Sequence, residues 1–153
     1  MNRLPRLRSF FSAAIAVVAS TAPGLLAQDA PATEPPPAVN FSLPAFTKEG
    51  YRSFLLRAST ARFAAPKEIE MRNTNLTVFS GDAANQVETV ILSPVATFLT
   101  DRQVATGAGP VRLIRDDAEI TGDQWRYDHA RKTIFIAKNV RVVFHAALPD
   151  LIQ

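Results

Sequence analysis

Hydrophobic and polar residues alternate in short runs along most of the chain. The segments 111–113 (VRL) and 140–142 (VRV) place an apolar side chain at every second residue, and the segment 125–128 (WRYD) repeats the pattern with aromatic residues. A period of two residues is typical of a β-strand with one buried and one solvated face. The segment 134–136 (IFI) lacks polar alternation, so we expect it to be covered on both faces.

Turn residues separate these runs at short intervals, and the runs themselves are rich in Val, Ile, Phe and Thr. No 3.6-residue amphipathic period persists long enough to predict a helix. Short strands with frequent turns indicate an all-β sandwich, barrel or open β-roll. The segment 69–79 is either one long strand or two that meet at residues 73–75. The expected strands cover residues 41–46, 52–57, 69–79, 88–92, 96–99, 111–115, 118–121, 125–128, 133–137 and 140–145.

The N-terminus has the pattern of a secretory signal peptide. Three arginines precede an apolar run at residues 10–18, and small residues lead to Ala27, the order that defines such signals. We expect cleavage after Ala27; cleavage after Ala22 also fits but leaves Pro23 directly after the cut. A retained membrane anchor or a buried N-terminal helix are the alternatives. A spanning helix needs about 20 apolar residues, and Pro23 and Gly24 interrupt the run.

The sequence divides into a signal segment or anchor at 1–27, a linker at 28–40, a domain at 41–145 and a tail at 146–153. The linker is dominated by proline, alanine and small polar residues, which favours an extended tether; a segment without function is the alternative. The domain is large enough for one core and too small for two. The chain contains no cysteine, which excludes disulfides and zinc sites built on thiolates.

The positive net charge of the chain comes from its targeting segment. Three of the 17 basic residues and none of the 14 acidic residues precede Gln28, which leaves 14 basic and 14 acidic residues in the rest of the chain. Nucleic-acid binding needs a clustered basic surface that neutralises phosphates. A balanced mature chain therefore argues against a nucleic-acid partner.

Two stretches of the domain look like copies of one unit. The later copy contains V-R-L at 111–113, I-T-G at 120–122, the aromatic strand at 125–128, and K-T-I-F-I and N-V-R-V at 132–136 and 139–142. The earlier and looser copy covers residues 89–111. Gly122 and the Asp-x-x-x-Lys segment at 128–132 stand where we expect the meander to reverse.

The order and spacing of these segments resemble the lipopolysaccharide-transport bridge proteins, the LptA/LptC group also called OstA-like. The matching features are the repeated glycine-turn-aromatic-Asp strand, the ending K-x-I-x-I-x-x-N-V-R-V, and an upstream block at 44–61 that is nearer the LptC branch. Phe54 stands where that branch is expected to have tryptophan. The resemblance covers about residues 41–144. An LptC-like protein normally keeps its N-terminal helix in the inner membrane, whereas this N-terminus looks cleavable.

The resemblance implies an open β-jellyroll, or β-taco, in the periplasm, with the acyl chains of lipid A in an apolar trough. It implies lipopolysaccharide, other β-jellyroll proteins and an inner-membrane ABC exporter as partners, and neither a cofactor nor catalysis. A sheet with one apolar face and no helix to cover it must close on itself or bind something apolar. Each candidate trough residue has ordinary core packing as its alternative. The candidates are Phe54, Leu56, Leu76, Val78, Val90, Leu92, Phe98, Val111, Leu113, Ile120, Trp125, Tyr127, Ile134, Ile136, Val140, Val142 and Phe144.

The first and last strands are expected to be the edges of this roll. The segment 140–144 has no proline or bulge signal, and the segment 41–46 carries Pro44, which an edge tolerates. We expect both edges to join other β-rolls by strand addition. The alternative is that the linker and the tail cap two edges that have no partner.

The candidates for catalysis and metal binding are few, and none has a matching second group. His129 and His145 lack a further histidine or cysteine at ligand spacing, so we expect both to be solvated. The acidic residues Asp116, Asp117, Glu119 and Asp123 lack the spacing of a calcium loop and fit a polar hairpin turn. Ser59-Thr60, Ser80-Gly81-Asp82 and the segment 107–110 match no nucleophile or phosphate-binding motif. We therefore predict a protein that is not an enzyme and holds no metal.

Two other functions remain open at this stage. The first is a structural or adaptor β-domain of the cell envelope that binds protein and no lipid. The second is a soluble carrier for another amphipathic ligand, such as a lipoprotein or glycolipid. A lipid that co-purifies with the domain would favour a lipid-binding function over the adaptor.

Overall fold

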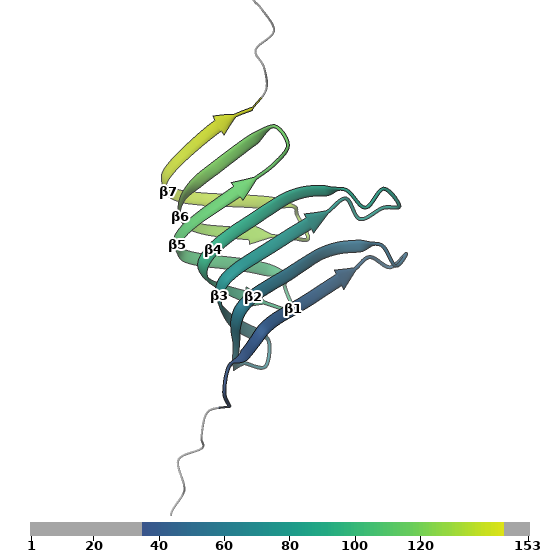
Figure 1. Cartoon of the computed structure of the whole chain (residues 1–153), viewed down its shortest axis with the longest axis vertical. Helices are drawn as coiled ribbons and strands as arrows, with labels where there is room; N and C mark the ends of the chain where they lie inside the picture. Colours follow the sequence, from purple (N-terminus) through teal and green to yellow (C-terminus); the bar gives the residue numbers. More distant parts are fainter. Residues whose placement is uncertain (1–34, 146–153) are drawn as a thin grey trace, which may run out of the picture. The chain divides into compact units, whose positions relative to one another are not determined.

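The computed structural model describes residues 35–145, and within them the chain forms seven strands and no helix. The strands pair in sequence order as one antiparallel sheet, with β1 and β7 at its edges (Figure 1). The all-β prediction is thus confirmed. The predicted signal peptide, most of the linker and the tail lie outside the described residues. The strands are β1 (Ala38–Phe46), β2 (Arg52–Ala65), β3 (Glu68–Phe79), β4 (Val87–Leu99), β5 (Val104–Ile114), β6 (Ala118–Asp128) and β7 (Thr133–Phe144).

The strands are longer than the sequence pattern predicts. β4 joins the expected runs 88–92 and 96–99, β6 joins 118–121 and 125–128, and β7 joins 133–137 and 140–145. The prediction that Gly122 reverses the chain is wrong, because β6 continues through it. The segment 129–132, by contrast, does connect β6 to β7. Turn-forming residues inside a strand bend it, and the ladder on either side keeps its direction.

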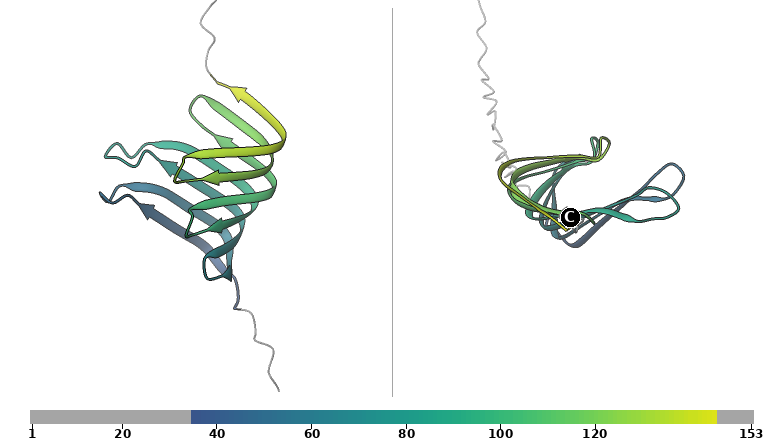
Figure 2. Two further views of the ribbon diagram at one scale, coloured as in Figure 1. Left: turned by 180° about the vertical axis from the view of Figure 1, so that it is seen from behind. Right: turned by 90° about the horizontal axis from the view of Figure 1, so that it is seen from above.

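A line of irregular residues crosses the middle of the sheet. Pairing between neighbours is interrupted there; between β3 and β4, for example, the register passes from Arg72–Val95 to Thr74–Ser93. Asparagine adopts the left-handed region more readily than most residues, which suits it to such a line. The non-glycine residues with positive φ on this line are Asn40, Asn73, Gln124 and Asn139. Figure 2 shows the sheet folded about its middle.

The fold line divides the sheet into two leaves. The first leaf contains residues 41–46, 52–58, 74–79, 87–93, 111–114, 118–122 and 140–144, and the second contains 61–65, 68–72, 95–99, 104–107, 125–128 and 133–137. Each strand except β1 thus contributes several residues to both leaves. The apolar face of each leaf turns toward the other, as in a sandwich made by bending one sheet.

The core lies between the two leaves. Phe54 of the first leaf meets Phe98 of the second edge-on, with ring centroids 5.7 Å apart. Backbones approach within 8 Å only between neighbouring strands, so the leaves contact each other through side chains. The core cluster consists of Phe54, Leu56, Ala58, Ala61, Ile69, Met71, Leu76, Val78, Ile91, Ala96, Phe98, Ala105, Val111, Leu113, Trp125 and Tyr127. Burial of this surface is the main stabilising contribution available to a chain without disulfides.

Candidate functional site

One row of apolar residues crosses the inner face of the first leaf from edge to edge. The paired residues, one from each strand, are Leu43, Leu56, Leu76, Ile91, Leu113, Ile120 and Val142. Residues paired across a ladder share a face, so this row defines the inner side. Leu56 is 0% exposed and Leu113 2%, whereas Val142 is 43% exposed. The row is therefore covered in the centre and open at β7.

The second leaf supplies the opposite wall. Phe98 pairs with Ala105, Ala105 with Tyr127, and Tyr127 with the half-buried Ile134 of β7. Trp125 packs in the next row, against Gly107. Its indole occupies the space that a Cβ on Gly107 would need, and its Nε1 has no hydrogen-bond partner. Glycine at 107 therefore allows the indole to approach the backbone of β5 closely.

The structure divides the predicted trough residues into distinct groups. Phe54, Leu56, Leu76, Val78, Phe98, Val111, Leu113, Trp125 and Tyr127 are all buried in the core between the leaves. Ile120, Ile134 and Ile136 are partly buried against that core. The remaining residues on the inner face of β7 are open to solvent: Val140, Val142 and Phe144 are 52%, 43% and 73% exposed.

Val90 and Leu92 are not on the inner face. Ile91 pairs with Leu76 and Leu113 in the buried row, so the residues on either side of it point outward. The segment 87–92 (VETVIL) ends in three consecutive apolar residues. Alternation in the sequence therefore does not show which of the three points inward. Only the pairing with β3 and β5 shows that Ile91 is the inward residue. Ile91 is thus a core residue that the sequence pattern missed.

The expected burial of the segment 134–136 on both faces is wrong. Ile134 and Ile136 are half-buried on the inner side, but Phe135 is 65% exposed on the outer side. The reason is the position of β7 at the edge of a single sheet, whose outer face is covered by no second layer among residues 35–145.

A polar cluster joins the free ends of the two leaves. The Nε2 atom of His129, in the β6–β7 turn, lies 2.6 Å from the Oγ atom of Ser53 on β2, and Nδ1 lies 3.1 Å from the hydroxyl of Tyr127. Nearby, Lys132 Nζ lies 2.9 Å from Glu88 Oε2. His129 is only 8% exposed, which corrects the expectation that it is solvated. Its backbone N–H donates to Gln103, so it is held by the adjacent turn.

Burial changes the titration of this cluster. Desolvation lowers the pKa of His129, and the nearby charge of Lys132 lowers it further. Desolvation also raises the pKa of Tyr127 to about 12. Both groups are therefore neutral near neutral pH, and each can donate and accept hydrogen bonds. His145, by contrast, is exposed as expected, and its backbone N–H donates to Asp117.

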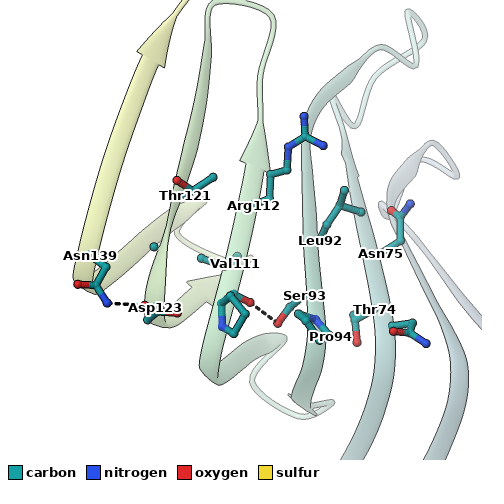
Figure 3. A pocket seen from close by; sticks show the side chains of 13 residues that line it. Thr74, Asn75, Leu92, Ser93, Pro94, Val111, Arg112, Thr121, Asp123 and Asn139 are labelled. Carbon is teal, nitrogen blue, oxygen red and sulfur yellow. Dashed lines mark hydrogen bonds between the residues drawn. The ribbon is translucent and has the colours of Figure 1, made fainter.

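An open depression of about 670 Å³ lies at the fold line (Figure 3). Leu92, Pro94 and Pro110 line it together with polar side chains of β3, β6 and β7. Ser93 donates to the carbonyl oxygens of both Val95 and Pro110, where the pairing of β4 with β5 is interrupted. These contacts satisfy backbone groups at the bend, so the hydroxyl has a structural role.

The acidic residues do not gather into a metal site. Glu119 forms a two-point contact with Arg112, which lowers the pKa of the carboxyl, and Asp123 accepts a hydrogen bond from Asn139. Asp117 lies near Arg115 in the β5–β6 turn. No group of three or more His, Cys, Asp or Glu residues capable of holding a metal occurs among residues 35–145. Asp116 and Asp117 lie in the β5–β6 turn as expected, whereas Glu119 and Asp123 lie within β6, so the prediction of a single polar turn holds only in part.

The serine-containing segments also have structural partners. Ser59 donates to the carbonyl of Arg72 and accepts from Asn73, which ties β2 to β3 at the fold line. Asp82 accepts hydrogen bonds from the Ser80 hydroxyl and from the backbone of Ala84; the first of these is the main cause of its lowered pKa. The two hydroxyls thus hold a loop at Ser80 and join neighbouring strands at Ser59.

Comparison with known proteins adds no assignment: no family model matches the chain, and no curated protein matches it. Within the part of the chain that the structure describes, no helix is long and apolar enough to cross a membrane. The inner face, its open end at β7 and the polar cluster between the leaf ends are thus the features on which a function can be argued.

Proposed function

We propose that this chain is a periplasmic lipopolysaccharide-binding transport component. Its folded sheet shields the acyl chains of lipid A and passes them along a bridge of similar β-rolls toward the outer membrane. The open antiparallel sheet agrees with the β-taco that the family resemblance implies. The proposal needs affinity for apolar chains and no catalytic group.

The observation that carries the proposal is the open end of the inner row. Val142 continues the apolar row of the core, and Val140 and Phe144 stand beside it on the same face of β7; all three are exposed and lack an opposing layer among the described residues. Exposed apolar surface of this kind marks a binding surface for lipid or protein. An acyl chain on β7 removes that surface from water and extends the core by one more layer.

The free edge of β7 supports the second part of the proposal. β7 has one neighbour, β6, and contains no proline, whereas β1 at the opposite edge carries Pro44. A strand added to β7 would continue both the hydrogen-bonded ladder and the apolar inner row. We therefore propose that β7 joins the next β-roll in the bridge and that the chain receives its lipid from an inner-membrane ABC exporter.

Site-specific photo-cross-linking tests lipid binding. A photoreactive residue at Val142, on the inner face, should cross-link to lipopolysaccharide, whereas one at Arg141, on the outer face of the same strand, should not. Val142→Asp should reduce the yield of cross-linking from a probe at Val140. The thermal unfolding midpoint should change little, because Val142 is 43% exposed. Equal cross-linking from 141 and 142 would contradict the proposal.

Strand addition is tested by removing the edge. Deletion of residues 140–153 should abolish co-purification with a partner β-roll, since the added strand loses its template. The substitution Arg141→Gln keeps the strand and serves as the control. Unchanged co-purification after the deletion would show that β7 is not the joining edge.

An adaptor domain that binds protein and no lipid is the second candidate. The observation that favours it is the filled centre: the inner residues of β2 to β5 already pack against each other and are almost fully buried. Native mass spectrometry of the purified domain separates the two functions. A bound lipid supports transport, and a lipid-free domain that still binds its partner supports the adaptor.

A further inference from the structure

We propose that Ser53–His129 and Glu88–Lys132 form a latch that holds the free ends of the two leaves together and opens the space between them when it breaks. The latch is defined by these four residues. His129 and Lys132 lie in the β6–β7 turn at the end of the second leaf, whereas Ser53 and Glu88 lie near the end of the first leaf. Both contacts therefore cross the opening between the free ends of the two leaves, which we call the mouth of the folded sheet.

The position of the latch follows from the topology. Continuous backbone joins the leaves only at the fold line, and backbones approach closely only between sequential strands. At the opposite ends, side chains must hold the leaves together. The hydrogen bond between Ser53 and His129 spans 76 residues, and the ion pair between Glu88 and Lys132 spans 44. Among the interactions described for residues 35–145, these two are the polar contacts that cross the mouth.

The two links differ in strength, which suits a device that opens. Ser53 and His129 make a short, partly buried hydrogen bond, and the His129 ring packs against Phe54 with centroids 4.9 Å apart. Breaking it leaves a buried ring nitrogen without a partner, which is costly. The Glu88–Lys132 pair is about half exposed, so water and salt compete for it. Opening thus begins at the ion pair and is completed at the histidine.

The latch stands directly over the apolar interior. A polar cleft of about 450 Å³ at the mouth has Glu88, Lys132 and Arg115 on its rim, and it reaches Val78 and Tyr127 of the inner face. Separation of the leaf ends would expose these residues and then the Phe54–Phe98 pair behind them. That an acyl chain enters by this route rests on the proposed function; the opening itself does not.

The charges around His129 set how the latch responds to pH. Lys132 opposes protonation of the ring, whereas Asp128 and Glu88 favour it. The remaining groups packed against the ring, Ser53, Phe54 and Tyr127, carry no charge near neutral pH. Burial of the ring is the largest influence and lowers the pKa of His129, so a protonated ring is disfavoured in the closed mouth and acidification should favour the open arrangement.

Spin labels on the two leaf ends test the latch in the full chain without any lipid. The chain has no cysteine, so Asp116→Cys and Arg102→Cys can be labelled alone; both are exposed, in the β5–β6 turn of the first leaf and the β4–β5 turn of the second. In this parent, double electron–electron resonance should give one narrow distance distribution. Adding Ser53→Ala and Lys132→Gln should shift it to longer distances and broaden it.

The matched control breaks equivalent contacts that do not cross the mouth. Ser59→Ala removes a serine hydrogen bond at the fold line, and Arg112→Gln removes a short ion pair within the first leaf. This variant should keep the parent distribution. A latch variant that matches the parent would overturn the proposal, as would an equal shift in the control.

A second measurement keeps the test informative if the double latch variant does not fold. Glu88→Gln alone removes the half-exposed ion pair and a charge that favours protonation of His129, and its distance distribution should broaden below the ordinary histidine pKa of about 6.5 more than that of the parent. No broadening in either protein would overturn the latch. Lipid cross-linking at Val142 is read separately, so a leaf that opens without binding lipid would contradict the proposed function and leave the latch standing.

Discussion

The centre of the sheet and its β7 edge carry the same inward pattern but have opposite surroundings. Leu76 in β3 and Val142 in β7 belong to one row of paired residues on the inner face. Leu76 is 1% exposed because the second leaf covers it, whereas Val142 is 43% exposed. Alternation thus determines the side to which a residue points, and the opposing layer determines whether that side is core or surface.

The largest expected effect on stability is at the centre of the apolar row on the inner face. Leu76→Ala should lower the free energy of unfolding by about 2–5 kcal/mol, the range for removing a buried leucine side chain from a packed core. The measurement is urea denaturation followed by circular dichroism. A loss below about 1 kcal/mol would indicate that the centre is already loosely packed, as an open trough would be.

A smaller loss in the free energy of unfolding is expected for a substitution at Gly107 of β5, which packs against Trp125. Gly107→Ala places a methyl group against the Trp125 indole and 3.0 Å from the carbonyl oxygen of Val95, which should cost about 1–3 kcal/mol by overpacking. Gly109→Ala, two residues away, meets no atom within 4 Å and is the control. If both substitutions have the same effect on the unfolding midpoint, close packing at Gly107 is not the cause.

The pH dependence of stability should report the protonation of His129, the buried histidine at the free ends of the leaves. Because burial lowers the pKa of His129 in the folded chain, the unfolded chain takes up a proton first as the pH falls. The stabilisation is therefore fully present above the unfolded pKa of about 6.5 and decreases as the pH falls through the folded pKa. Unfolding midpoints measured across this range should show the decrease in the parent and a weaker one in His129→Gln.

The smallest effect on stability is expected at β7. Val142→Ala should change the free energy of unfolding by less than about 0.5 kcal/mol, as is usual for a surface position, because the side chain has no opposing layer in the described structure. The same urea denaturation as for Leu76→Ala provides the comparison. A loss as large as that of Leu76→Ala would show that β7 is covered in solution, by another copy or by a part of the chain outside residues 35–145.

The sequence pattern predicted several local features of the fold. Alternation in β2, β3 and β5 identified Leu56, Leu76 and Leu113 as inward residues, and they are buried. Leu76 has a polar residue on both sides, Asn75 and Thr77, and Leu56 and Leu113 each have an arginine on one side, which is enough to indicate the inward face. It was not enough in β4, where three apolar residues in succession hid the phase and led to Val90 and Leu92 instead of Ile91.

By itself, the sequence determined that the chain is all-β, where most strand segments lie and which side of most of them is apolar. These properties depend on residues close together in the chain. Only the tertiary structure decided that Gly122 and Asn139 bend a strand instead of ending it, and that the bend places His129 against Ser53. Contacts over such separations arise when one continuous sheet folds onto itself, and no local period records which residues then meet.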